Sequence, residues 1–136
     1  MDKIKVLIVD DEVDYLTLMK EYVEYWGYAA ISAQSGQEAL AMIKAELPEI
    51  VVLDYLMPQM NGIAVLKEIR KFNPFLEVIM FTAHSDLKNI RGAQELGVSS
   101  FVPKLSDDSL NIQSSLRAAI DLAQKRIKQA KDQNNG

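Results

Sequence analysis

The chain has 136 residues, of which 49% are hydrophobic and 25% are charged, as expected for one globular domain and not for a disordered chain or a coiled-coil rod. Its formal net charge is -4, which argues against non-specific binding to nucleic acid, and we expect no direct nucleic-acid binding from this chain. Cysteine is absent and His84 is the single histidine, so the sequence excludes thiol chemistry, a disulfide scaffold and a histidine metal cage. Because neither a signal peptide nor a membrane-spanning run is evident, we expect a soluble cytoplasmic protein that does not contact membranes.

Short runs rich in β-branched residues alternate with amphipathic stretches along the chain. The predicted strands are residues 4–9, 28–33, 50–53, 76–81 and 99–102. The predicted helices are residues 14–26, 36–47 after a capping box of Ser35 and Glu38, 63–72, 86–96, and a last helix from a cap at Ser106 or Asp107 to about Lys131. The apolar residues at helical spacing in the first helix are Tyr15, Leu18, Met19, Tyr22 and Val23. The polar tail 132–136 is expected to fray.

The first, third and fourth predicted strands are apolar throughout instead of alternating. Strands of this kind are buried on both faces, as in a parallel sheet that is covered by helices. With right-handed crossovers, the alternation of strand and helix predicts an α/β fold, a doubly wound three-layer sandwich. Ligands of such folds bind beyond the carboxyl ends of the strands, so the residues that follow each strand are the candidates for function.

Polar and charged residues that suit phosphoryl transfer follow four of the predicted strands. Asp10, Asp11 and Asp54 are hard oxygen ligands whose mutual repulsion a divalent cation would relieve, and Mg²⁺ suits them better than zinc. Lys104 adds a positive charge and Thr82 a hydroxyl, which together would stabilise a transferred phosphoryl group, with Asp54 as the nucleophile. Alone, Asp10 and Asp11 are equally typical of a turn and helix cap, and Asp54, Thr82 and Lys104 are more typical of turn, structural and surface residues, so the hypothesis depends on their joint placement.

Four motifs at these strand ends together resemble the receiver domain of bacterial two-component response regulators. The motifs are Val9-Asp10-Asp11-Glu12, Leu53-Asp54-Tyr55-Leu56-Met57-Pro58-Gln59-Met60-Asn61-Gly62, Phe81-Thr82-Ala83 and Phe101-Val102-Pro103-Lys104. The resemblance covers about residues 3–125 and implies a flavodoxin-like fold with a five-stranded parallel sheet of order 2-1-3-4-5 and five helices. Residues 126–136 would then be an extension of the last helix and a polar tail.

The resemblance also implies which residues carry the chemistry. Asp54 would be the phosphoacceptor, and Lys104 would pair with the phosphoryl oxygens. The Mg²⁺ cofactor would be held by Asp54, directly by Asp11, largely through water by Asp10, and by the backbone carbonyl of Leu56. A chain of this kind would promote its own phosphorylation and dephosphorylation and would not be a turnover enzyme.

Further residues would take part in switching. Thr82 and Phe101 resemble the family's switch pair, in which the hydroxyl moves to the phosphoryl group and the aromatic ring turns inward. Gly62 resembles the glycine of the loop after the acceptor, where a positive φ is expected. His84, two residues after the threonine, is interpreted as an exposed loop residue.

Two positions depart from the pattern of the family. Receivers usually have a proline after the lysine, often in a cis bond, whereas here Leu105 follows Lys104, so we expect a differently set or more mobile turn. Two residues past the acceptor the family often has a polar side chain that orients the hydrolytic water, and here this residue is Leu56. We hypothesise that the apolar side chain holds this water poorly and that the phosphorylated form is therefore long-lived.

The resemblance implies partners as well. Phosphate would come from a phosphohistidine of a sensor histidine kinase or a phosphotransfer protein, and the fourth helix, fifth strand and fifth helix would contact an output partner or a second copy. The last helix has an apolar seam, a row of residues spaced by four and three: Leu116, Ile120, Ala123, Ile127 and Ala130. This seam is either the face that packs on the core or the contact face of a linker helix. The alternative function is a phosphorylation-independent adaptor on the same fold. A phosphatase or flavin-binding protein is disfavoured, because no Asp-x-Asp motif and no glycine-rich phosphate loop is present.

Overall fold

The computed structural model describes residues 3–83, 87–104 and 109–135. Five strands and five helices alternate in this part of the chain. The strands are β1 (Lys5–Val9), β2 (Ala29–Ala33), β3 (Ile50–Leu53), β4 (Glu77–Thr82) and β5 (Ser100–Pro103). The helices are α1 (Val13–Tyr25), α2 (Gly36–Glu46), α3 (Gly62–Phe72), α4 (Leu87–Glu95) and α5 (Ser109–Asn135).

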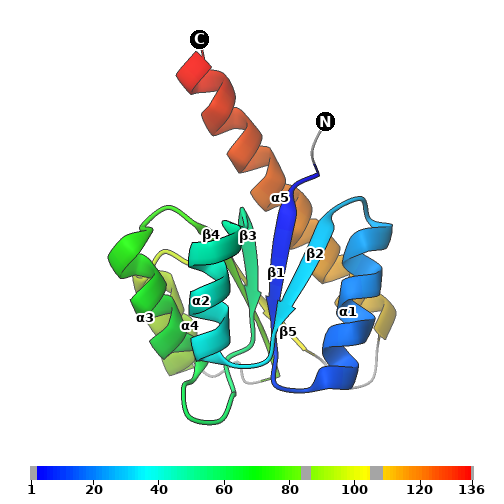
Figure 1. Ribbon diagram of the computed structural model, residues 1–136, viewed down its shortest axis with the longest axis vertical. Coiled ribbons are helices and arrows are strands. Elements are labelled where there is room, and N and C mark those ends of the chain that lie inside the picture. The colour runs from blue at the N-terminus through cyan, green and yellow to red at the C-terminus, as the bar shows by residue number, and fades with distance from the viewer. Residues whose placement is uncertain (1–2, 84–86, 105–108, 136) are drawn as a thin grey trace.

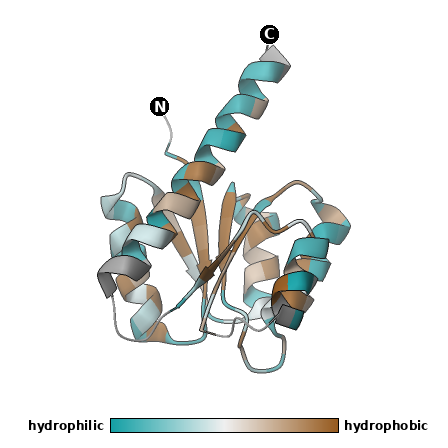
Figure 2. Cartoon of the chain, turned by 180° about the vertical axis from the view of Figure 1, so that it is seen from behind, coloured by the Kyte–Doolittle hydropathy of each residue, from teal (hydrophilic) through white to brown (hydrophobic). Residues whose placement is uncertain are grey.

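The strands form one parallel sheet in the order β2-β1-β3-β4-β5, as predicted. Helices α1 and α5 cover one face of the sheet and α2, α3 and α4 cover the other, which gives the three-layer sandwich (Figure 1). The fold class that the sequence predicts is therefore confirmed. Figure 2 shows the strands coloured mainly as hydrophobic, between helices that carry both hydrophilic and hydrophobic residues.

The core lies on both faces of the sheet. Every residue of β3 is buried, and so are all residues of β1 and β4 except the first of each strand. One cluster packs the sheet against α1 and α5, and the other packs it against α2, α3 and α4. The continuous apolar runs of these strands thus have the physical cause that was predicted, burial on both faces.

The buried face of α1 differs in part from the apolar pattern read in the sequence. Its buried residues are Leu16, Met19 and Val23, whereas Leu18 is 41% exposed. The buried positions are spaced by three and four residues, so Leu16 and not Leu18 shares a face with Met19 and Val23. Both leucines fit a helical pattern, and only the packing of α1 on the sheet distinguishes between them.

The predicted cap of α2 is confirmed. The Ser35 hydroxyl accepts a hydrogen bond from the backbone N–H of Glu38 at 3.1 Å. The Glu38 carboxylate in turn accepts a hydrogen bond from the Gln34 backbone N–H at 3.2 Å. The helix ends at Glu46, before Leu47, which has a φ of 51° and a side chain that is 74% exposed.

Helix α5 continues to Asn135 instead of ending near Lys131 in a frayed tail. No glycine or proline lies between Lys104 and Asn135, so the sequence contains nothing that would terminate the helix there. The last turns of α5 project beyond the sandwich in Figure 1. The predicted cap at Ser106 or Asp107 lies outside the described residues.

The seam on α5 is the core face of the helix over its first half. Leu116, Ile120 and Ala123 are buried in the core, Ile127 packs partly against it, and Ala130 is exposed. Arg126 joins this helix to β4, because its Nε lies 2.6 Å from an Oε1 of Glu77. Among the described residues, no helix is long and apolar enough to cross a membrane.

Candidate functional site

Four of the predicted site residues lie together where parallel strands end. Val9 of β1 is paired with Leu53 of β3, so the next residues, Asp10 and Asp54, come side by side, and the Asp54 N–H donates to the Val9 carbonyl at 3.1 Å. Thr82 is the last residue of β4, and its carbonyl accepts a hydrogen bond from the Lys104 N–H at 2.7 Å. Strand pairing therefore brings together residues that are up to 94 positions apart.

Three carboxylates form an acidic cluster at this edge of the sheet. Asp10 and Asp54 are buried and Asp11 is exposed. Each carboxylate offers one ligand oxygen, and these three oxygens all lie within 4.8 Å of one another. The Glu12 backbone N–H donates a hydrogen bond to Asp10 Oδ1 at 3.0 Å, which fixes the orientation of that carboxylate.

Lys104 is the cation of the site. Its Nζ lies 2.6 Å from Asp10 Oδ2 and 3.6 Å from Asp54 Oδ2, so it pairs more closely with Asp10 than with the proposed acceptor. The same ammonium group lies 4.4 Å from the centre of the Tyr15 ring and 5.3 Å from that of Phe81. Two aromatic faces and two carboxylates therefore confine the lysine head group.

Burial raises the pKa of Asp54 above its usual range, because desolvation disfavours the ionised carboxylate. The positive charge of Lys104 lowers this pKa, and the negative charge of Asp10 raises it further. Hydrogen bonds from the Thr82 hydroxyl and the backbone of Leu56 also lower it. Burial and the nearby carboxylates also raise the pKa of Tyr15 to about 12. Ionisation of the Asp54 carboxylate is thus electrostatically costly, although Lys104 and two hydrogen-bond donors offset part of the cost.

A surface hollow of about 450 Å³ opens over these residues. Asp54 and Lys104 line it together with Asp11, and Leu56, whose side chain is 55% exposed, forms part of its apolar rim. The Asp54 carboxylate is therefore reached from the surface through this opening.

The acidic cluster fits a hard divalent cation. Its donors are carboxylate oxygens, which Mg²⁺ prefers, and Asp11 is exposed, so water could complete the coordination sphere. Two of the carboxylates are buried with a single lysine as their cationic partner among the described residues, so a second positive charge would relieve the remaining repulsion. The expected metal site is therefore compatible with the residues present.

Gly62 has a different structural role from the one expected. The described glycines with positive φ are Gly27 and Gly97, so Gly62 is not needed for a left-handed conformation. A Cβ on Gly62 would lie 2.5 Å from the Asp54 carbonyl oxygen and 2.9 Å from the Tyr55 Cα. The glycine is required because the start of α3 passes directly against the backbone of Asp54 and Tyr55. In this loop Gln59 has the positive φ, 71°.

The remaining predicted residues differ in their placement relative to the acidic cluster. Phe101 lies on β5, is half-buried, and packs against the core cluster beneath α3 and α4. The Thr82 hydroxyl, in contrast, already hydrogen-bonds to Asp54. His84 and Leu105 lie outside the described residues.

The sequence interpretation missed Tyr15 as a site residue. It was assigned to the helical apolar pattern of α1, and the ring does pack partly against the core. Its second contact, with Lys104, joins residues from opposite ends of the chain, and no local sequence pattern indicates such a contact.

Comparisons with known proteins identify the family of the chain. The family model described as response regulator receiver domain matches residues 6–117. A solved structure of a response regulator receiver domain protein from Clostridium thermocellum is 30% identical, with a TM-score of 0.83, and covers 93% of this chain and 98% of that one. The signal receiver domain of a putative Luxo repressor protein from Vibrio parahaemolyticus is 26% identical, with a TM-score of 0.85, over 100% of this chain and 99% of that one.

Relatives with assigned names are longer proteins. The transcriptional regulatory protein ZraR of Escherichia coli is 34% identical over 119 residues, which are 88% of this chain and 27% of that protein. The probable transcriptional regulator ycf27 of Porphyridium aerugineum is 35% identical over 135 residues, which are 99% of this chain and 54% of that protein. The chain thus spans about a quarter to a half of these relatives. Because both are named as transcriptional regulators, the comparisons do not support the expected absence of nucleic-acid binding.

Proposed function

Because the chain belongs to the response regulator receiver domain family, we propose that it is a phosphorylation-controlled signalling switch with Asp54 as the phosphoacceptor. One observation carries this proposal. The buried Asp54 carboxylate lies beside Lys104, accepts a hydrogen bond from Thr82, and shares an acidic cluster with two further aspartates. A phosphorylation-independent adaptor would need none of these groups at the strand ends.

In the proposed reaction, an oxygen of ionised Asp54 attacks the phosphorus of a phosphohistidine on a partner kinase or phosphotransfer protein. A P–O bond to Asp54 forms as the P–N bond breaks, and the electron pair of that bond returns to the imidazole nitrogen, which takes up a proton from solvent. Lys104 neutralises charge on the phosphoryl oxygens and Thr82 donates a hydrogen bond to one of them. The chain is then a stoichiometric acceptor and not a turnover enzyme.

Mg²⁺, when bound, would supply positive charge that stabilises the transferred group. The residues that would hold it are Asp10, Asp11 and Asp54, with the backbone carbonyl of Leu56 as a further oxygen ligand. Their support is the donor set described above, in which carboxylate oxygens lie within 4.8 Å of one another.

The proposed output is a change on the surface formed by α4, β5 and α5. Thr82 and Phe101, at the end of β4 and within β5, would transmit the state of Asp54 to that surface, where an output partner or a second copy would bind. A cytoplasmic location and the absence of direct nucleic-acid contact by this chain stay predictions.

Incubation with acetyl phosphate tests the proposal. With Mg²⁺ present, we expect intact-mass measurement to show a gain of one phosphoryl group, which hydroxylamine removes as expected for an acyl phosphate. Asp54→Asn should abolish the gain, whereas Asp132→Asn, which changes an exposed aspartate near the end of α5, should leave it unchanged. A chain that folds but gains no phosphate would instead support the adaptor.

A further inference from the structure

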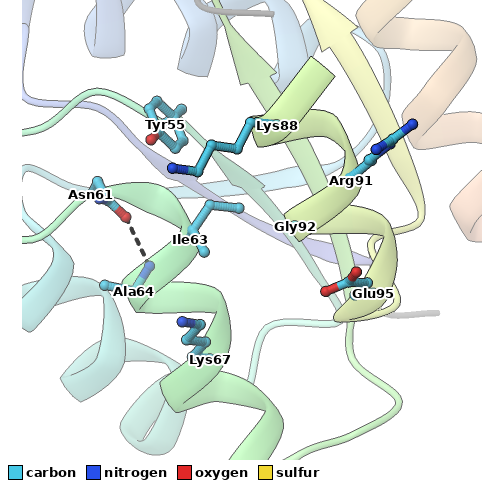
Figure 3. A pocket seen from close by; sticks show the side chains of 9 residues that line it. All are labelled: Tyr55, Asn61, Ile63, Ala64, Lys67, Lys88, Arg91, Gly92 and Glu95. Carbon is cyan, nitrogen blue, oxygen red and sulfur yellow. Dashed lines mark hydrogen bonds between the residues drawn. The ribbon is translucent and has the colours of Figure 1, made fainter. Parts of the chain in front are cut away.

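A second hollow, of about 770 Å³, lies between α3 and α4, on the side of the sandwich away from α1 and α5. Its walls come from the two helices and from Tyr55, the residue that follows Asp54. Ile63, Ala64 and Gly92 form an apolar floor between the helices (Figure 3). None of these residues belongs to the acidic cluster, so the hollow, which we term the α3–α4 groove, is a separate surface feature.

The α3–α4 groove is cationic although the chain as a whole is anionic. Its charged residues are Lys67, Lys88, Arg91 and Glu95, which gives a local excess of positive charge on a chain of net charge -4. Figure 3 shows Lys88 reaching across the groove toward Tyr55, while the Arg91 guanidinium points away from the floor. Among the described residues, neither Lys67 nor Lys88 has an ion-pair partner, in contrast with Lys71, which lies 2.8 Å from Glu68.

Gly92 contributes the space in the floor of the groove. It lies inside α4, where glycine is unfavourable compared with alanine. Among the residues that the structure describes, a Cβ at this position would meet only Ile63 Cδ1, at 3.7 Å, which is an ordinary van der Waals distance. Its φ is not among the positive values, so neither packing nor backbone conformation requires glycine here. Because Gly92 has no side chain, the floor of the groove has room at this position for a side chain of a bound partner.

From this geometry we propose that the α3–α4 groove binds an acidic peptide segment of a partner protein. An aliphatic side chain of the segment would cover the floor at Ile63 and Gly92, and flanking carboxylates would pair with Lys67 and Lys88. The inference goes beyond the proposed phosphorylation of Asp54 and does not depend on it.

The groove is less suited to a phosphate or a nucleotide. The first turn of α3 would be the natural place for a phosphate, but its Ala64 N–H already donates to the Asn61 side chain at 2.9 Å. The guanidinium that could bind a phosphate through two hydrogen bonds, that of Arg91, is turned away from the floor. Lysine ammonium groups above an aliphatic floor instead match a carboxylate beside an apolar side chain.

The test uses the ¹⁵N-labelled chain without phosphodonor or Mg²⁺, so its outcome is independent of phosphorylation. The probes are end-capped peptides of alternating glutamate and leucine in both registers, the same peptides with lysine for glutamate, and adenosine monophosphate. We expect the glutamate peptides alone to shift the backbone amide signals of α3 and α4 in a saturable way.

Two variants probe the charge and the shape of the site. Combined Lys67→Glu and Lys88→Glu should weaken peptide binding at least about ten-fold, since each attractive charge becomes repulsive. The matched control, Lys125→Glu with Lys128→Glu, changes net charge equally on exposed positions of α5 and should bind as the parent does. Gly92→Leu should fill the floor and also weaken binding, and its unchanged amide spectrum outside the groove would show that it folds.

Three results would overturn the proposal: no saturable shift with any glutamate peptide, equal binding by the charge-reversed variant and its control, or shifts centred on another face. Saturable shifts of the groove amides with adenosine monophosphate but not with glutamate peptides would also overturn it, in favour of a nucleotide site.

Discussion

Lys104 and Asp10 form the closest ion pair of the acidic site, with Nζ 2.6 Å from Oδ2, whereas Asp54 Oδ2 lies 3.6 Å from the same nitrogen. The lysine therefore neutralises a proposed metal ligand more closely than the proposed phosphoacceptor. A divalent cation beside Asp10 would compete with this ion pair and leave Lys104 available to the phosphoryl group.

Lys104→Gln should consequently bind Mg²⁺ more tightly while accepting phosphate more slowly. Removal of a positive charge next to the carboxylates should lower the dissociation constant for Mg²⁺ by about ten-fold, because the cation no longer competes with the ammonium group. Isothermal titration measures the affinity, and mass spectrometry measures the phosphorylation rate with acetyl phosphate. Lys125→Gln is the control, and an unchanged or weaker Mg²⁺ affinity in Lys104→Gln would contradict the prediction.

Asp54→Asn should stabilise the metal-free chain. Because burial raises the pKa of Asp54, ionisation costs more in the folded than in the unfolded state, and this cost is present at pH values above the unfolded pKa. The free energy of unfolding contributed by this group falls as pH rises from below the unfolded pKa through the folded pKa. An uncharged amide should therefore raise the free energy of unfolding by about 1–2 kcal/mol at pH 7.

Urea denaturation in the presence of EDTA measures this difference at pH 7 and again near pH 4, where it should shrink. Asp132→Asn, on the exposed end of α5, should be neutral. A less stable Asp54→Asn variant would mean that Lys104 and the hydrogen-bond donors outweigh the desolvation of the carboxylate.

Tyr15→Leu should slow phosphorylation, whereas Tyr15→Phe should not. The Tyr15 ring lies 4.4 Å from Lys104 Nζ, and contacts of this kind contribute about 0.5–2 kcal/mol. Loss of the aromatic face should let the lysine adopt other positions and reduce the rate with acetyl phosphate about three- to ten-fold. Since burial and nearby carboxylates raise the pKa of Tyr15 to about 12, the hydroxyl stays protonated near neutral pH. Equal rates for the two variants would exclude a role for the ring.

Gly62→Ala should destabilise the chain and impair the acceptor. The added Cβ would lie 2.5 Å from the Asp54 carbonyl oxygen, so the backbone of Asp54 and Tyr55 must shift. We expect a loss of about 1–3 kcal/mol in the free energy of unfolding, as for other overpacked positions. Gly92→Ala is the matched control, because its Cβ would lie no closer than 3.7 Å to its nearest neighbour and should be neutral or stabilising. Denaturant unfolding of both variants separates the two cases.

Leu56→Asn should shorten the lifetime of the phosphorylated chain. Leu56 lines the hollow over Asp54, and its side chain is 55% exposed, so it can support a hydrolytic water only through apolar contact. An amide at this position can hold that water by hydrogen bonding, and we expect hydrolysis to become about ten-fold faster. The decay of the phosphorylated mass after removal of acetyl phosphate provides the measurement. A lifetime equal to or longer than that of the parent chain would disprove the hypothesis.

The sheet and the location of the site could be predicted because both follow from short-range patterns. Continuous apolar runs such as Ile50–Leu53 indicate strands buried on both faces, and alternation with amphipathic stretches indicates parallel pairing. Since parallel strands end at one edge, Asp10, Asp54 and Thr82 had to meet there.

Three features depended on the tertiary structure. Leu16 rather than Leu18 faces the core, because both fit a helical period and only the docking of α1 on the sheet chooses between them. Gly62 is required because a Cβ would contact the Asp54 backbone, and not because of its own φ. Residue propensities cannot distinguish between these two reasons for a glycine. The α3–α4 groove combines residues of two helices whose relative placement is set by packing on the sheet.

Periodicity and turn chemistry act over a few residues, so the local sequence indicates which elements form and which side chains follow the strands, and the resemblance to the receiver family indicates the strand order. The pairing of Lys104 with Asp10 and its contact with the Tyr15 ring, in contrast, are visible only in the folded chain. Such contacts join residues some 90 positions apart, and their distances depend on how the whole sheet twists and packs, which no local pattern records.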